Sequence, residues 1–434
     1  MWRVPILVSI GLLALSLAGG TGAGAVTDVQ RADVDQDGVV TIFDLATVTN
    51  QFGAHTTGGA DVDGDGTVTI FDLTLVAQHF GEHVVATPTP TQTPAPAPTA
   101  TPPPATRDKL RQPFASTSPW NMPLGAGARY APVGFKPDLD YATVDEDVIV
   151  LTPNAPRRDL YIHGNSIGRC VQSGLTGVRV PIPDAYQVPD ADSVWKPNFA
   201  GAFLMPDGRT IVQTSATARC GVGAPVTAGF RVSNVDIYGD GIAGGHGGSG
   251  MSSVGGSIRL GELVGAAPIR HALKMNIDCL RYCSQANGGY RWPALNADMY
   301  ALNWDGYGSQ GYAVPGLGMG SLLALPPSLD IGAMGLETAA GKKLAWTLQN
   351  YGAYVVDDAH NPAGNWSVIA WDAEKGADDE LFAATGYRLD ANIGPSYRDT
   401  VRIVTALAMV DNNGPSSVGG GGTPRQPLAP PIGN

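Results

Sequence analysis

The sequence lacks several features that mark common functional classes. Its 434 residues carry 27 Lys and Arg against 39 Asp and Glu, a net charge of −12, and no basic stripe runs along the chain. A nucleic-acid-binding surface is therefore not expected, because such surfaces gather positive charge to meet the phosphates. The phosphate-loop pattern GxxxxGK followed by Ser or Thr is also absent. No apolar run reaches the roughly 18 residues of a membrane-spanning helix.

The longest apolar run lies at the N-terminus and predicts a secretory signal. Arg3 precedes an apolar stretch from about Val4 to Ala18, and Ala23-Gly-Ala25 fits a signal-peptidase site. We therefore expect residues 1–25 to be a signal peptide. The mature protein is expected to be secreted, with no membrane span after cleavage, and either free or tethered at a cell surface.

Cysteine is scarce, and its four copies all lie beyond residue 160. Outside the cell an even number of cysteines usually forms disulfides. Of the three possible pairings we favour Cys170–Cys220 together with the local pair Cys279–Cys283. A zinc site is the alternative, although no Cys-x-x-Cys or neighbouring His completes a ligand set.

A twelve-residue acidic segment occurs almost twice, at Asp33–Asp44 and Asp61–Asp72. A loop of the EF-hand type supplies oxygen ligands to calcium from positions 1, 3, 5, 7, 9 and 12, and has Gly at position 6 for the turn. Both copies have this pattern, with Asp rather than Glu at position 12. We expect two calcium ions, bound by Asp33, Asp35, Asp37, Val39, Thr41 and Asp44 in the first loop and by Asp61, Asp63, Asp65, Thr67, Thr69 and Asp72 in the second.

Each loop is followed by the pattern of one helix. Leu45, Val48 and Phe52 share a helical face, Gly53 stands at the expected C-cap, and the second copy repeats this pattern. A calcium loop with one helix, written twice, resembles the dockerin type I family over about residues 27–84. The resemblance implies a small all-α, EF-hand-like module that binds a cohesin domain and commonly tethers enzymes that degrade polysaccharides.

In that family, residues at loop positions 10 and 11 contact the partner. Here these are Ile42-Phe43 and Ile70-Phe71, which differ from the small hydroxyl pairs of cellulosomal dockerins. The partner is therefore expected to be a different cohesin, or the use is intramolecular or purely structural. The apolar pairs could equally form a core between the two halves of the module.

Composition divides the rest of the chain. Residues 87–106 are rich in Pro and Thr and contain no charged residue, which predicts an extended linker. We assign residues 26–86 to the dockerin-like module, 107–412 to one large domain, and 413–434 to a Gly/Pro-rich tail.

The local patterns of the large domain are mostly those of strands. Residues 202–214 predict a hairpin around Asp207-Gly208, and further strand-like runs occupy 232–238, 257–263, 269–276, 354–357 and 368–372. One helix is expected at about 339–351. We predict a multidomain protein whose large domain is mainly β, like a β-sandwich or jelly roll, with few helices.

The candidate catalytic residues are His246, Glu262, Asp357 and Asp372. Glycines surround His246, which would let the backbone approach a ligand closely. Two carboxyl groups, such as Glu262 with Asp357 or Asp372, are what glycoside hydrolysis needs. A polysaccharide lyase would instead use His246 or Tyr354 as the base. His271 ranks lower, because it would share a strand face with apolar residues. The alternative is a glycine-rich turn whose charges face water.

These observations favour a secreted carbohydrate-active enzyme with a calcium-dependent tether. The reaction would be hydrolysis of O-glycosyl bonds or a lyase cleavage, in polysaccharide catabolism, with a polysaccharide as substrate. Five of the eight Trp could stack on sugar rings, although most Trp side chains pack in cores: Trp195, Trp292, Trp304, Trp366 and Trp371. The alternative is a non-catalytic extracellular surface or matrix protein that binds glycan or protein.

Overall fold

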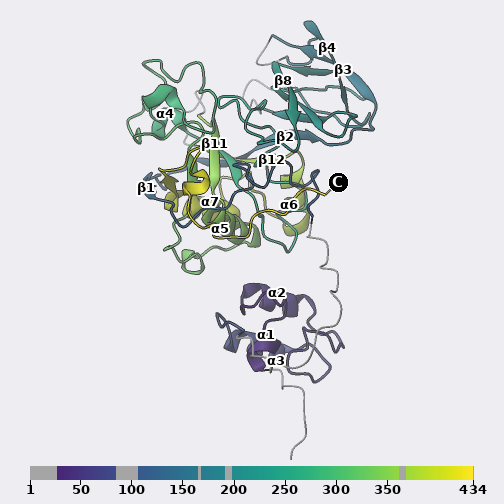
Figure 1. Ribbon diagram of the computed structural model, residues 1–434, viewed down its shortest axis with the longest axis vertical. Coiled ribbons are helices and arrows are strands. Elements are labelled where there is room, and N and C mark those ends of the chain that lie inside the picture. The colour runs from purple at the N-terminus through teal and green to yellow at the C-terminus, as the bar shows by residue number, and fades with distance from the viewer. Residues whose placement is uncertain (1–26, 85–105, 165–167, 191–197, 361–367, 434) are drawn as a thin grey trace, which may run out of the picture. The chain divides into compact units, whose positions relative to one another are not determined.

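The computed structural model describes residues 27–84, 106–164, 168–190, 198–360 and 368–433. The chain divides into two compact units, Met1–Thr101 and Pro102–Asn434 (Figure 1). The boundary between the units falls within the linker expected from the sequence. The expected signal peptide and nearly all of this linker lie outside the described residues. Among the described residues, no helix is both long and apolar enough to cross a membrane.

The first unit contains three short helices, α1 (Asp28–Ala32), α2 (Ile42–Asn50) and α3 (Ile70–Gln78). Thr41 and Thr69 cap α2 and α3, and the last acid of each loop completes a capping box. The core is small and consists mostly of valine and alanine: Ala32, Val40, Val48, Ala60, Val62, Val68 and Val76. The apolar pairs Ile42-Phe43 and Ile70-Phe71 are outside this core, because all four side chains are exposed.

The second unit is built on a ten-stranded sheet. Its strands, in spatial order, are β1 (Tyr130–Pro132), β13 (Ala408–Val410), β10 (Leu322–Ala324), β11 (Ala353–Asp358), β9 (Leu273–Ile277), β12 (Val368–Glu374), β2 (Tyr141–Val150), β5 (Gly201–Leu204), β6 (Thr210–Ser215) and β8 (Phe230–Asp236). A second sheet has the order β4 (Gly174–Pro181), β3 (Arg157–Ile162) and β7 (Val226–Ala228).

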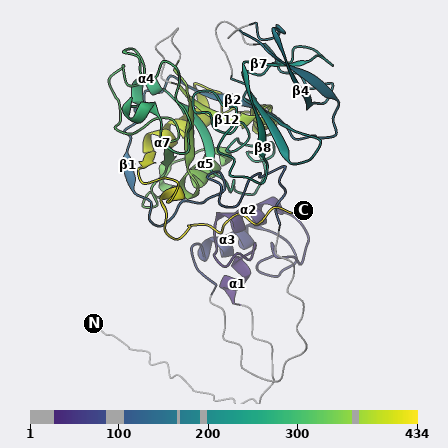
Figure 2. The same ribbon diagram turned by 45° about the horizontal axis from the view of Figure 1, so that its top comes forward.

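Three helices pack on the large sheet: α5 (Ala339–Asn350), α6 (Ala377–Thr385) and α7 (Gly394–Ala406). They gather away from the three-stranded sheet (Figures 1 and 2). The main core lies among these helices and the central strands, and it includes Trp371 and Tyr354. A second core fills the space between the small sheet and strands β2, β5 and β6.

The expected mainly-β domain with few helices is confirmed. The predicted helix at 339–351 corresponds to α5. Three strand pairs of the large sheet are parallel, namely β11 with β9, β12 with β2, and β2 with β5. A jelly roll has antiparallel pairs, so these long-range parallel pairs give the sheet a different topology from the one that the local patterns suggested.

Two of the strand-like runs differ from the expectation. Residues 257–263 form no strand; only Ile258 makes an isolated bridge, to Ala373. Gly256 and Gly261 have φ of +79° and +84°, and a backbone in the left-handed region turns rather than extends. Strand β9 begins at Leu273, so His271 precedes the strand and the expected alternation does not apply to it.

Both favoured disulfides, Cys170–Cys220 and Cys279–Cys283, are formed. No thiol remains free among the four cysteines, so the zinc alternative has no thiolate ligand. The second disulfide closes a single helical turn, α4 (Cys279–Tyr282). Residues 413–433, expected as a tail, pack on the second unit, since Pro424 bridges to Gly125 and Ile432 to Arg107.

Candidate calcium loops and active site

The acids of the two loops turn inward, as calcium ligands do. Carboxylate oxygens of Asp33, Asp35 and Asp44 lie within 4.8 Å of one another, and those of the equivalent acids Asp61, Asp63 and Asp72 do the same. Like charges held this close repel each other, and a bound cation removes that repulsion. Three acids of each loop are thus close enough together to share one cation, as the predicted ligand set requires.

Aspartate at position 12 reaches the loop because the helix cap orients it. Asp44 is buried, and its carboxylate accepts hydrogen bonds from the backbone N–H of Asp35 at 3.0 Å and of Thr41 at 2.7 Å. Asp72 accepts the corresponding bonds from Asp63 and Thr69. The aspartate side chain is one methylene shorter than that of Glu, and these hydrogen bonds hold its carboxylate on the ligand side of each loop.

A second group of acids is buried in the large unit, where the strand register brings it together. In the parallel pair β12–β2, Asp372 lies opposite Asp145, and Glu374 lies opposite Asp147. Partners in register project from the same face of the sheet. Asp145, Asp147 and Asp372 are each less than a tenth exposed, so three carboxyl groups share one buried face.

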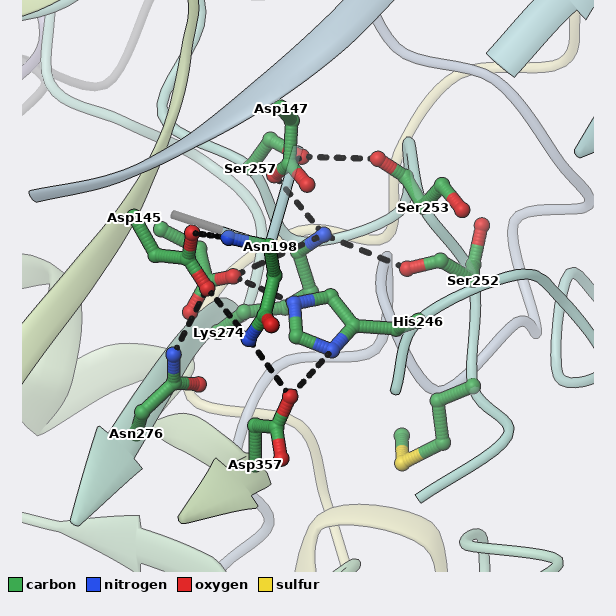
Figure 3. Close-up of polar contacts among 12 residues, drawn as sticks. Asp145, Asp147, Asn198, His246, Ser252, Ser253, Ser257, Lys274, Asn276 and Asp357 are labelled. Atoms are coloured by element: carbon green, nitrogen blue, oxygen red, sulfur yellow. Dashed lines mark hydrogen bonds and ion pairs between the residues drawn. The ribbon is translucent and has the colours of Figure 1, made fainter. Parts of the chain in front are cut away.

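The glycine-rich loop places His246 against these acids (Figure 3). Its Nε2 lies 2.6 Å from Asp372 Oδ1, and its Nδ1 lies 3.8 Å from Asp357 Oδ2. The glycines around it are sterically required. A Cβ on Gly245 would lie 2.6 Å from the backbone of Thr214 in β6, and a Cβ on Gly247 would lie 2.9 Å from Asp357 Oδ2.

Asp357, at the end of β11, lies close to a further acid, Asp298, which was not a predicted candidate. A Cβ on Gly248 would lie 2.7 Å from Asp357 Oδ1 and 3.3 Å from Asp298 Oδ1, so the two carboxyl groups face each other across this glycine. The amide of Asn198 donates to Asp357 Oδ2 at 2.7 Å and to Asp145 Oδ2 at 3.1 Å. Unlike His246, Asp298 is only half-buried, which places the Asp298–Asp357 pair at the outer side of the cluster.

Cationic side chains are buried with these acids. Lys274 Nζ lies 2.9 Å from Asp147 Oδ2 and 4.0 Å from Asp372 Oδ1, and it donates to the carbonyl of Ser252 at 3.2 Å. Ser257 Oγ donates to Asp147 at 2.7 Å (Figure 3). Arg169 is also buried, and its charge interacts with that of Asp145. Burial nevertheless raises the pKa of Asp145, Asp147 and Asp372, so these acids keep their protons more readily than exposed ones do.

The electrostatics of the cluster favour protonated acids around a neutral imidazole. Burial, followed by the charges of Asp298 and Asp145, raises the pKa of Asp357 well above its usual range. Burial raises the pKa of Asp372 to about 7, although Lys274 acts in the opposite direction. Burial, reinforced by Lys274, lowers the pKa of His246. A carboxyl group that keeps its proton near neutral pH can act as a general acid.

The same cluster contains a set of metal-ligand types. Asp145, His246 and Asp372 each offer an atom within 4.8 Å of the others. The amides of Asn198 and Asn276 already donate to Asp145, and Asp372 bonds to His246 with Lys274 nearby. Asp372 Oδ2 and Asn276 Oδ1 are nevertheless buried without a hydrogen-bond partner among the described residues. The geometry therefore fits a divalent cation as well as acid–base chemistry.

Glu262 lies apart from the His246 cluster. Its carboxylate bonds to His271 Nε2 at 3.1 Å and accepts from the backbone N–H of Arg259 at 2.7 Å. Burial alone would raise the pKa of Glu262, but the neighbouring His271 lowers it. The structure brings together three of the four candidates from the sequence, His246, Asp357 and Asp372, and Glu262 holds the turn that precedes β9.

Asp145, Asp147 and Asp298 were not among the candidates predicted from the sequence. The first two could have been found, because both fall on one face of an apolar strand-like run, residues 141–151. Buried acids in such a run need partners. Asp298 lies in a turn-rich segment with no comparable signal. Of the aromatic candidates, Trp371 is buried and Trp304 is exposed, and Trp195 and Trp366 lie outside the described residues.

Comparison with known proteins identifies one part of the chain. Residues 31–81 match the model of the dockerin type I domain, in agreement with the resemblance seen in the loops. Dockerin domains bind calcium, interact with cohesins and are typically found in extracellular proteins. No curated protein and no solved structure matched the chain.

Removal of calcium should unfold the first unit, because its core of seven small side chains contributes little stability without the metal. We expect a chelator to remove part of the helical circular dichroism signal of the full chain and added calcium to restore it. Asp33→Ala should lower the calcium affinity. The matched control is Asp28→Asn, an exposed acid outside the loops. A helical signal indifferent to chelator would show that the metal does not hold this fold.

Proposed function

We propose, starting from the dockerin type I module at residues 31–81, that this protein is a secreted enzyme that cleaves a polysaccharide. The module would bind two calcium ions and attach the protein to a cohesin-like domain, and the large unit would hydrolyse O-glycosyl bonds. The observation that carries the catalytic part is the pair Asp298–Asp357. Two carboxyl groups face each other there, and a buried His–Asp pair lies behind one of them.

The roles follow from burial and protonation. Asp357 would be the general acid, because its raised pKa keeps a proton available for the leaving oxygen. Burial raises the pKa of Asp298 as well, and the hydrogen bond from Tyr307 opposes this shift. Because Asp298 is the more exposed of the two acids, it would act as the base or the nucleophile on the other side of the bond. His246 and Asp372 would be positioning residues. The imidazole is wholly buried, so it acts on Asp357 rather than on substrate.

The charge of the cluster favours hydrolysis over a lyase reaction. A lyase acting on uronates needs a cation to neutralise the substrate carboxylate. Two cations near the described acids, Lys274 and Arg169, are both buried, and Lys274 is paired with Asp147. The carboxylate of Asp298, the more exposed of the two acids, would repel a uronate. Hydrolysis of an uncharged glycan has no such conflict.

The attachment would involve the exposed apolar pairs of the module. Ile42 with Phe43, and Ile70 with Phe71, lie at the first turns of α2 and α3 and face solvent. Contiguous exposed apolar side chains mark interaction surfaces. A cohesin that accepts these side chains would present an apolar face. The N-terminal signal would direct secretion of the protein to the extracellular side, where such a partner would be met.

We expect the partner interface to be sensitive to polar substitution. Replacing Ile70 and Phe71 together by Ser should weaken binding to a cohesin with an apolar contact face by about tenfold or more, because two exposed apolar side chains lose their contact. Surface plasmon resonance with a panel of cohesins would measure this. Phe230→Ser, at an exposed apolar position of the large unit, is the control. Unchanged affinity would rule out the pair as a contact.

Asp357→Asn should abolish cleavage. Loss of the proton donor is expected to lower kcat by about 10² to 10⁴-fold, measured on the full chain with a panel of polysaccharides and mass spectrometry of the products. Asp379→Asn, an exposed acid on α6 outside the cluster and outside residues 298–307, should keep the full rate. Unsaturated products would contradict hydrolysis. Binding of a glycan without cleavage of any panel member would favour a non-catalytic binding protein.

The pH profile should report the protonated form of Asp357. The rate is expected to fall as pH rises through the raised pKa of this acid, since only the protonated form can donate. The charge of Asp358 is one of the causes that raise the pKa of Asp357. Asp358→Asn should therefore move the basic limb of kcat/KM to lower pH. A basic limb that stays in place, or moves upward, would exclude Asp357 as the acid.

A further inference from the structure

The loop next to the acid pair exposes apolar side chains that the proposed chemistry does not use. Within residues 298–307, Met299 is 102% exposed, Leu302 60% and Trp304 91%. Tryptophan is costly to leave in water, since its side chain is among the largest apolar surfaces. We call these three side chains the Trp304 platform. Such a group on a protein surface usually marks a binding site.

The loop that carries the platform is fixed by hydrogen bonds. The loop is closed by backbone hydrogen bonds from Asn303 to Tyr300 at 2.9 Å and from Tyr307 to Ala301 at 3.0 Å. The amide of Gln285 donates to the carbonyl of Asn303 at 2.7 Å. The next residues bond to the backbone of α4, the turn that the disulfide Cys279–Cys283 closes. The exposure of Trp304 is thus held in place by the surrounding structure.

Two tyrosines connect the loop to the candidate active site. Tyr307 donates its hydroxyl to Asp298 Oδ2 at 2.5 Å, and Tyr300 donates to Asp358 Oδ2 at 2.7 Å. The two rings pack edge to face, 6.3 Å between centroids. The loop that exposes the platform therefore also supplies Asp298 and orients it. A ligand on the platform would lie on the element that forms one side of the acid pair.

We infer that the Trp304 platform is a subsite for an uncharged polysaccharide chain, with the indole stacked on a pyranose ring. The inference rests on the proposed function and names its substrate class. The loop carries Asp298 and Asp305 and adjoins Asp358, so an anionic chain would be repelled. Three side chains are also far fewer than the 20 to 30 residues that a stable protein interface uses on each side. A narrow, flexible chain with apolar ring faces fits this surface.

Binding of glycan to an uncleaving form of the full chain tests the inference separately from catalysis. With Asp357→Asn as background, affinity electrophoresis in gels containing a neutral β-glucan, xylan or mannan should show retardation by at least one of them. Adding Trp304→Ala should weaken that retardation by about tenfold, since the stacking surface is lost. Trp304→Tyr should restore most of it. Leu428→Ala, at an exposed site elsewhere in the unit, is the control and should change nothing.

Each outcome bears on the inference. Retardation unaffected by Trp304→Ala would overturn it, as would preference for polygalacturonate over every neutral chain, or no binding to any neutral chain. A dimer seen by light scattering and lost in Trp304→Ala would assign the platform to a second copy instead. Tryptophan-dependent binding by a wild-type protein that cleaves nothing would support the subsite and reject the proposed hydrolysis. Cleavage by the Trp304→Ala variant with an unchanged KM would support the proposed hydrolysis and reject the subsite.

Discussion

The large unit depends on the burial of carboxyl groups in the centre of its sheet. Asp145, Asp147 and Asp372 come from two adjacent parallel strands, and an isolated charge in such a place costs many kcal/mol. Lys274, the imidazole of His246 and bound protons offset that cost. These partners come from β9 and the glycine-rich loop, so strands β2, β9, β11 and β12 cannot shift against one another without leaving a buried charge unpaired. The packing of these strands and the protonation state of the site therefore depend on each other.

Glycine makes this arrangement possible at a specific point. His246 can enter the cluster only because the residues on either side of it have no Cβ to strike β6 or Asp357. The same absence at Gly248 lets Asp298 and Asp357 face each other. The backbone is in turn fixed, since Ser249 N–H donates to the carbonyl of Val356 in β11 at 3.1 Å. A segment whose composition is typical of a flexible turn is thus a tightly packed wall of the site.

The sequence predicted local features well and long-range ones in part. The calcium loops are read from twelve consecutive residues, and the capping boxes of Thr41 and Thr69 arise within the same stretch. The helix at 339–351 and the two disulfides were also predicted. The parallel pairs of the sheet join strands such as β2 and β12 that lie more than two hundred residues apart, and no local pattern encodes their register. For that reason Asp145 was missed beside Asp372, and Glu262 was paired with acids that it does not meet.

The two units use clustered acids in opposite ways. In the loops of the first unit the carboxylates are held by backbone N–H donors, as Asp33 is by Gly38 and Asp61 by Gly66. At Asp72 burial would raise the pKa, but hydrogen bonds from the backbone N–H groups of Thr69, Asp63 and Val62 lower it, which keeps this carboxylate charged and available to a cation. In the second unit burial disfavours the charged form, and the pKa of Asp147, like that of Asp372, rises to about 7. Charged oxygens suit a hard metal ion, whereas protonated ones suit proton transfer. A change in free calcium would therefore act first on the attachment module, because burial lets Asp147 and Asp372 of the catalytic cluster keep their protons near neutral pH.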